Sequence, residues 1–171
     1  MKQKILISTG GTGGHVIPAI TIYDHLKNEH EVSICTDVRG LKYLDINDFK
    51  IFEIDTPKLN RSILFPFIIL KVLFLTIKSL LLLKKEKIQI LISTGGYMSL
   101  PLCLAGKILN IKIFLFEPNM IIGRANKFFL NFCEKIICYS NNINGLPSKF
   151  KKKLEISSPF IRRQYYEKKF K

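Results

Sequence analysis

Two glycine-rich stretches carry the residue types and spacing best suited to chemistry. The heptapeptide ILISTGG occurs at residues 5–11 and again at residues 90–96. Beyond the first copy, glycine occupies four of the five positions 10–14, around Thr12, and His15 follows directly. A backbone without β-carbons can approach a ligand closely, and a following helix adds the positive end of its dipole. The pattern predicts an anion site, most often one for phosphate.

The second copy predicts a similar turn, with Ser99 and Pro101 near the start of the helix that follows. Two such turns on one sheet edge indicate a long anionic ligand, or two ligands that meet. For the second turn, glycines that only allow a tight connection are an equally good interpretation. The spacing matches neither GxGxxG nor a Walker loop. The residues expected to contact ligand are Thr12, Gly13, Gly14, Gly95, Gly96 and Tyr97.

His15 directly follows the first glycines, at the expected start of a helix. A lone histidine is usually structural. Its place beside an expected phosphate site favours a role as general base or as a contact to a diphosphate. These two roles both stay open.

The amino-acid composition limits the classes of binding partner that are plausible. The chain has 171 residues and a formal net charge of +14, which suits nucleic acid, a lipid surface or a phosphorylated substrate. Lysine is abundant throughout, so a general compositional bias explains the charge equally well. The aromatic residues lie within apolar runs rather than between basic residues, so no nucleic-acid partner is expected.

Neither a metal nor a cofactor is expected. The four cysteines form no CxxC pair, and no Asp-x-Asp pair occurs. Buried, reduced thiols in a cytosolic protein are the better interpretation of Cys35, Cys103, Cys133 and Cys138.

Apolar runs of strand length alternate with helical patterns along the chain. The expected strands cover residues 4–8, 31–36, 50–54, 89–93, 112–116, 135–139 and 154–157. The expected helices cover residues 17–28, with Pro18 in the first turn, and residues 66–85, 99–109 and 122–131. This alternation predicts an α/β fold, a Rossmann-like parallel sheet with helices on both faces. We expect one domain over residues 1–160, followed by an exit segment at residues 161–171.

Residues 63–83 form an apolar stretch long enough to span a bilayer. A single crossing there would place the two glycine turns on opposite sides of a membrane and disrupt the sheet. Lysines recur every seven residues, on one helical face, which favours a helix lying in the membrane interface. The expected membrane contacts are Phe67, Lys71, Phe74, Lys78 and Lys85. The alternative is a core helix whose lysines extend to solvent.

Four segments, in order, resemble one family of enzymes. GGTGGHVIPA and STGGYMSLP resemble the two glycine loops of the bacterial N-acetylglucosaminyltransferases that form lipid II in peptidoglycan synthesis. FEPNMIIGRANK is similar to their HEQN-x-x-x-G-x-x-NK segment, and SSPFIRR to the GNPVR stretch that leads out of their first domain. The resemblance covers nearly the whole chain and implies the N-terminal half of a GT-B glycosyltransferase.

The resemblance implies inverting transfer of N-acetylglucosamine from UDP-N-acetylglucosamine to the muramoyl 4-hydroxyl of undecaprenyl-diphosphate-linked lipid I. This half would receive the lipid-linked acceptor at the cytoplasmic face of the inner membrane, as a peripheral protein on an anionic surface. By the same resemblance Thr12, Gly13, Gly14 and Asn119 touch the nucleotide-sugar, and Arg162 (or Arg163) reaches the donor. A donor domain would complete the enzyme.

The sequence departs from the family pattern around Glu117. Phe116 and Pro118 replace the family's His and Gln, and Ser158 replaces the Asn of GNPVR. Glu117 is a candidate general base, and a carboxylate that caps the following turn is the alternative. A second function class also stays open, in which the chain is a non-catalytic, membrane-recruiting subunit of a split two-chain transferase with a donor-domain partner chain.

Overall fold

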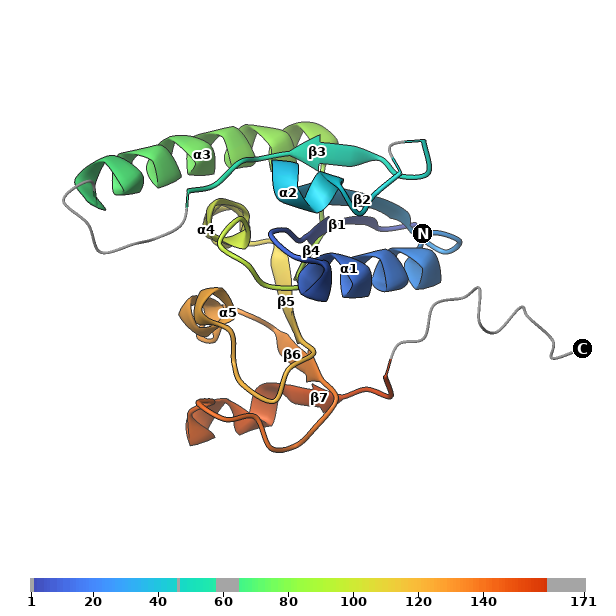
Figure 1. Cartoon of the computed structure of the whole chain (residues 1–171), viewed down its shortest axis with the longest axis vertical. Coiled ribbons are helices and arrows are strands. Elements are labelled where there is room, and N and C mark those ends of the chain that lie inside the picture. Colours follow the sequence, from blue (N-terminus) through green and yellow to red (C-terminus); the bar gives the residue numbers. More distant parts are fainter. Residues whose placement is uncertain (1, 46, 58–64, 160–171) are drawn as a thin grey trace, which may run out of the picture.

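A computed structural model describes residues 2–45, 47–57 and 65–159 of the chain. Its seven strands form one parallel sheet in the order β3-β2-β1-β4-β5-β6-β7 (Figure 1). The strands are β1 (Lys4–Ser8), β2 (Glu31–Thr36), β3 (Ile51–Glu53), β4 (Ile90–Ser93), β5 (Lys112–Glu117), β6 (Lys135–Cys138) and β7 (Leu154–Ile156). The predicted α/β class with a parallel sheet is therefore confirmed.

Helices cover both faces of the sheet because side chains alternate along each strand. From β1, Ile5 and Ile7 pack with Val16 and Ile22 of helix α1 (Gly13–Leu26). Leu6 points the other way, into a second core formed with α3 (Phe65–Glu86), α4 (Ser99–Ile108) and α5 (Arg124–Phe129). Figure 1 shows α3, α4 and α5 on one side of the sheet and α1 on the other.

Three details of the predicted helices were wrong. Helix α1 begins at Gly13 rather than residue 17, so the glycine loop forms its first turn and Pro18 lies inside the helix. The sequence pattern assigned Gly13 and Gly14 to a loop because they are glycines. Glycine can also adopt helical backbone angles, so the helix begins there. The short helix α2 (Val38–Leu41) and a 3₁₀ helix at Ser148–Lys153 were not predicted, because both are too short to show a periodicity.

The two ILISTGG copies lie side by side as β1 and β4. They pair residue for residue, Ile5 with Ile90 through to Ser8 with Ser93. The amide of Thr94 donates to the carbonyl of Ser8 at 3.0 Å, so the pairing continues beyond both strands. The two glycine turns therefore leave the same edge of the sheet next to each other.

Helix α3 is anchored to the core through one strip in its C-terminal half. Leu75, Ser79 and Leu83 recur every four residues and are buried, in the core that α3 shares with α4. By length and composition the helix could span a membrane, with a mean hydropathy of 2.2 over its most apolar window. The sheet excludes a crossing, because α3 connects β3 to β4 and both strands belong to one parallel sheet.

The four cysteines are all buried, as expected, and none is in a disulfide. Burial raises the pKa of the Cys103 thiol to about 12 and the pKa of Cys138 above its usual value. Such thiols stay protonated at neutral pH and are poor nucleophiles.

The anchoring of α3 predicts a contrast between two leucines of this helix. Leu83 is 1% exposed and Leu70 is 62% exposed. We expect Leu83→Ala to lower the free energy of unfolding by about 2–5 kcal/mol, since it removes packed methyl groups and leaves a cavity. Leu70→Ala should change it by less than about 0.5 kcal/mol. Urea unfolding followed by circular dichroism checks both, and equal losses would contradict the one-sided anchoring.

Candidate functional site at the carboxyl edge of the sheet

The first glycine loop presents the start of α1 to solvent. Thr12 is the N-cap residue, its side chain makes no capping hydrogen bond, and Thr12 and Gly14 are both exposed. The N–H groups of a first helical turn have no acceptor within the helix, so here they are available to an anion. Gly11 has a φ of +84°, a conformation that glycine adopts without strain.

An ion pair between a buried carboxylate and a half-exposed arginine holds this loop in place. Asp37, which is 0% exposed, accepts hydrogen bonds from the amides of Gly11 and Gly40, both at 2.9 Å. Arg39 donates to the other carboxylate oxygen through Nε at 2.9 Å and Nη2 at 2.6 Å. Burial by itself would raise the pKa of Asp37, but these hydrogen bonds outweigh it and hold the pKa below its usual value. The half-exposed Arg39 guanidinium thereby sits beside the glycine loop.

His15 joins the first loop to the second. Its Nδ1 lies 2.7 Å from the carbonyl oxygen of Thr94. A carbonyl only accepts hydrogen bonds, so Nδ1 carries the proton and Nε2 of the neutral ring keeps its lone pair. Gly95 and Gly96 have φ values of +95° and +86°, and a β-carbon on Gly95 would lie 3.1 Å from Cε1 of His15. The second turn therefore needs glycine both for its backbone and for the approach of His15.

Glu117, at the carboxyl end of β5, is 2% exposed and has acceptor contacts on both oxygens. Oε2 accepts from the amide of Gly123 at 2.7 Å and from Nδ2 of Asn126 at 3.2 Å. Oε1 accepts from Nδ2 of Asn119 at 3.1 Å. A β-carbon on Gly123 would lie 3.0 Å from Oε2, so this turn closes tightly on the carboxylate. The geometry favours the second of the two roles considered, a carboxylate that organises the loop after β5.

A cavity of about 200 Å³ lies at the carboxyl edge of the sheet, between the start of α1, the second glycine loop and the loop before α5. It is several times the volume of about 30 Å³ that one water occupies in the liquid. Its lining brings three predicted residues, His15, Gly96 and Tyr97, together with Gly123, Arg124 and Ala125. The predicted residues Thr12, Gly13, Gly14 and Gly95 are not among its lining residues. In open α/β sheets ligands bind beyond the carboxyl ends of the strands, so this cavity is the candidate site.

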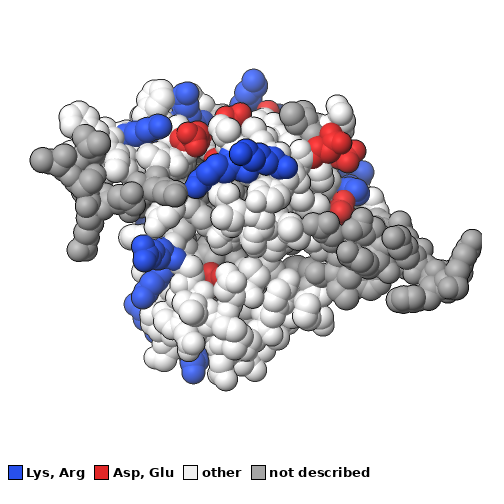
Figure 2. Space-filling view, in the orientation of Figure 1, with Lys and Arg blue, Asp and Glu red and all other residues white. Residues whose placement is uncertain are grey.

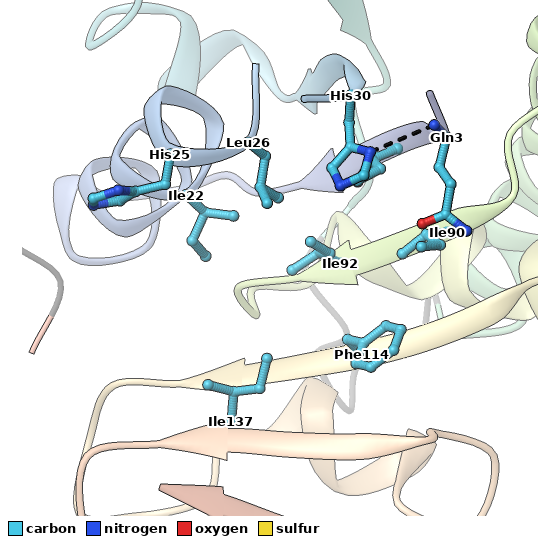
Figure 3. A pocket seen from close by; sticks show the side chains of 10 residues that line it. Gln3, Ile22, His25, Leu26, His30, Ile90, Ile92, Phe114 and Ile137 are labelled. Atoms are coloured by element: carbon cyan, nitrogen blue, oxygen red, sulfur yellow. Dashed lines mark hydrogen bonds between the residues drawn. The ribbon is translucent and has the colours of Figure 1, made fainter. Parts of the chain in front are cut away.

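A larger, apolar cavity of about 310 Å³ lies elsewhere, between α1 and the exposed face of β4 to β6 (Figure 3). Isoleucines and Phe114 line most of it, and the amide of Gln3 donates to Nδ1 of His30 at 3.4 Å at its polar rim. Gln3 and His30 lie at the amino ends of their strands, away from both glycine loops. Its lining offers few groups that could bind an anion, so it is not the candidate site.

Sequence reasoning missed four groups at the site. Asp37 and Arg39 come just after the buried run EVSICT, which forms the strand next to β1. A charged pair at the end of such a strand could have indicated a role at the site. Arg124 and Asn126 lie within the segment FEPNMIIGRANK, from which the sequence analysis selected only Glu117 and Asn119. Predicted Asn119 is exposed and adjoins the Glu117 loop. Predicted Arg162 lies outside the described residues, as does the exit segment at residues 161–171.

The fold and the candidate site together define a Rossmann-like α/β domain that carries two glycine loops at the carboxyl edge of its sheet. Comparison with protein families identifies which one: the glycosyltransferase family 28 N-terminal domain matches residues 5–138. The chain belongs to this family.

Several curated relatives share one name, UDP-N-acetylglucosamine--N-acetylmuramyl-(pentapeptide) pyrophosphoryl-undecaprenol N-acetylglucosamine transferase. The protein of that name from Pelagibacter ubique (strain HTCC1062) is 52% identical over 99% of this chain and 48% of its own length. The one from Rickettsia felis (strain ATCC VR-1525 / URRWXCal2) is 33% identical over 94% of this chain and 44% of its own length. The chain thus spans about half the length of the curated relatives it matches.

Solved structures share the fold at lower sequence identity. Acinetobacter baumannii MurG superposes with a TM-score of 0.76 at 22% identity, covering 99% of this chain and 50% of that one. A UDP-GlcNAc 2-epimerase from Neisseria meningitidis, bound to UDP-GlcNAc, has a TM-score of 0.63 at 14% identity, covering 90% and 45%. The sheet and helices therefore form the Rossmann-like fold of the N-terminal half of a GT-B protein, as predicted.

The buried Asp37 pair predicts a pH-dependent contribution to stability. A carboxyl group whose pKa is lowered on folding stabilises the folded state fully at pH values above its unfolded pKa, which is about 3.9. This stabilisation is lost as the pH falls below that value and through the folded pKa. Asp37→Asn should therefore lower the free energy of unfolding by about 1–3 kcal/mol at pH 7. The difference from wild type should shrink below about pH 4.

Urea unfolding at several pH values measures this difference. Asp24→Asn is the matched control, since Asp24 pairs with Lys27 on the surface of α1 and should contribute less than about 1 kcal/mol. Equal effects of the two substitutions at pH 7 would contradict the anchoring role of Asp37.

Proposed function

We propose that this chain is the acceptor half of an inverting N-acetylglucosaminyltransferase of peptidoglycan synthesis. The transfer runs from UDP-N-acetylglucosamine to the muramoyl 4-hydroxyl of lipid I and gives lipid II. The observation that carries the proposal is the pair of adjacent glycine loops at the carboxyl edge, joined by His15, beside a cavity that His15, Gly96 and Tyr97 line. The names of the relatives supply the substrates.

In the proposed reaction the acceptor hydroxyl oxygen bonds to the anomeric carbon while the bond from that carbon to the diphosphate oxygen breaks. The hydroxyl proton goes to Nε2 of His15, and UDP leaves with the bonding pair. Nε2 suits this task because Nδ1 is already committed to the Thr94 carbonyl. A contact from His15 to a diphosphate, the other role considered, uses the same free nitrogen.

Charge that develops on the departing diphosphate requires donors and positive groups fixed in advance. The first turn of α1, at Thr12, Gly13 and Gly14, supplies N–H groups and the helix dipole. Arg39 lies beside this loop, and Arg124 lines the cavity. We assign the second loop, Gly95, Gly96 and Tyr97, to the lipid-linked diphosphate of the acceptor. Asn119 is retained as a nucleotide-sugar contact, and Glu117 is assigned to holding its loop.

The exposed half of α3 is proposed to rest on the cytoplasmic face of the inner membrane. Its outward face carries an apolar surface that no described residue covers, made of Phe67, Leu70, Leu73, Phe74, Ile77 and Leu81. Lys71, Lys78 and Lys85 are exposed along the same helix, and Nζ of Lys78 lies 5.0 Å above the ring of Phe74. Lysines at lipid phosphates with apolar neighbours inserted are typical of a helix lying in the interface.

Basic side chains also gather on the face of the molecule that Figure 2 shows. In Figure 2, Lys and Arg gather over the upper part and the left flank, with Asp and Glu in smaller patches. The formal net charge of +14 strengthens the attraction to anionic lipid at low ionic strength. We propose that a donor-domain partner chain completes the site. In the alternative function, this chain is a non-catalytic subunit that recruits the same partner to the membrane.

A transfer assay tests the proposed reaction. Radiolabelled UDP-N-acetylglucosamine and a short-chain lipid I analogue are supplied to the 171-residue chain, alone and with a separate donor domain from a relative. We expect transfer only in the presence of the added domain. His15→Ala should then lower kcat by about 10²–10⁴-fold if His15 is the base. His25→Ala is the control, because His25 lines the other cavity.

An inactive mixture that retains native circular dichroism would favour the non-catalytic subunit. Equal activity of His15→Ala and His25→Ala would contradict the assignment of His15.

Vesicle sedimentation tests the membrane surface. The purified chain should bind phosphatidylglycerol-rich vesicles at low salt, and Lys71→Gln and Lys78→Gln should each weaken binding about fivefold, from about 1 kcal/mol per lysine. Phe74→Ser should also weaken it, whereas Ile156→Ser, an equally exposed apolar residue on β7, should not. A wild-type chain that stays in the supernatant would contradict the proposal.

A further inference from the structure

One peptide unit of the second glycine loop is held at both ends. Its carbonyl, on Thr94, accepts from Nδ1 of His15 at 2.7 Å. Its amide, on Gly95, donates to Oγ of Ser93 at 3.2 Å. In a trans peptide the C=O and N–H point in opposite directions, so fixing one end fixes the other.

The Ser93 hydroxyl belongs to a buried chain of hydrogen bonds that ends at a carboxylate. Ser93 Oγ donates to Oδ1 of Asn126 at 3.3 Å, and Nδ2 of Asn126 donates to Oε2 of Glu117 at 3.2 Å. The same Nδ2 donates to the carbonyl of Phe116 at 3.3 Å. Ser93, Asn126 and Glu117 are all essentially inaccessible to solvent, so water does not replace these partners.

The direction of every bond in this chain follows from its far end. The oxygens of Glu117 accept from Gly123 and Asn119 as well, as an ionised carboxylate does. Asn126 must therefore turn its NH₂ toward Glu117 and its oxygen toward Ser93. The Ser93 hydroxyl then has its one proton committed to Asn126, and its lone pairs accept from Gly95. The peptide is thus oriented with its carbonyl toward His15, which must carry its proton on Nδ1.

We propose that Ser93 and Asn126, with Glu117 at the far end, are positioning residues that set the tautomer of His15. They hold the Thr94–Gly95 peptide in the orientation that leaves Nε2 unprotonated toward the cavity. The catalytic meaning of this tautomer rests on the proposed function, but the tautomer itself does not. Without the Ser93 hydroxyl, the positive-φ glycines at 95 and 96 let the peptide rotate, and its N–H can then face Nδ1.

Nitrogen NMR of the imidazole rings tests this directly on the 171-residue chain. Long-range ¹H–¹⁵N spectra at about pH 8.5, where imidazole is neutral, distinguish the two tautomers. The His15→Gln variant assigns the signals of His15 among the chain's three histidines. We expect the Nδ1–H form in wild type and a mixture, or the Nε2–H form, in Ser93→Ala. Ser33→Ala is the matched control, since its buried hydroxyl donates to the carbonyl of Ile5 on β1.

A second variant covers the case in which Ser93→Ala fails to fold. Ser93→Cys is nearly isosteric, and its sulfur is only a weak acceptor for the Gly95 amide, so the peptide can rotate and the His15 tautomer should again become mixed. Amide spectra and circular dichroism establish that each variant is folded. A folded Ser93→Ala or Ser93→Cys that keeps the wild-type His15 pattern overturns the proposal.

The transfer assay separates this inference from the proposed function. With the donor domain added, Ser93→Ala should lower kcat roughly 10–100-fold, as for other groups that orient a functional histidine, with KM little changed. If Ser93→Ala changes the His15 tautomer but the wild-type chain catalyses no transfer, the inference stands and the proposed function fails. If the wild-type chain catalyses transfer but Ser93→Ala keeps the wild-type tautomer, the proposed function stands and the inference fails.

Discussion

The in-register pairing of β1 with β4 is the constraint on which the rest of the site depends. Because the two identical heptapeptides align residue for residue, both glycine turns leave the sheet at the same height. A slip by one residue would turn every side chain of one strand to the opposite face, exchanging the two cores. The burial of both faces therefore protects the alignment of the loops. Site geometry is in this sense a consequence of core packing.

Two buried carboxylates then convert that alignment into fixed loop conformations. Asp37 accepts a hydrogen bond from the amide of Gly11 in the first glycine loop, and Glu117 accepts one from the amide of Gly123 in the loop between β5 and α5. A buried charge is costly unless several donors surround it, so each carboxylate is compatible with folding only when its loop is closed. The hydrogen bonds that stabilise these charges also fix the loops that precede α1 and α5. His15 and Asn126 connect the loops to one another.

Helix α3 shows how one element serves two environments. Its C-terminal half satisfies the core through a narrow strip, while its N-terminal half keeps large apolar side chains exposed. An apolar surface of this extent on a domain usually marks an interaction site. The same helix is therefore fixed to the sheet that carries the loops, which couples the orientation of the surface to that of the cavity. A ligand attached to a lipid would meet both.

Local sequence determined the parts of this protein that depend on neighbouring residues. Apolar runs of strand length placed β1 and β2 at their observed bounds and the other strands within one residue at either end. Motif spacing drew attention to His15 and Gly96, which line the cavity. Only the tertiary structure decided which groups meet. The bond from His15 to Thr94 joins residues 79 positions apart, and that from Ser93 to Asn126 joins residues 33 apart. No local pattern encodes such contacts, because they arise from strand order and from the burial of Asp37, Ser93, Glu117 and Asn126.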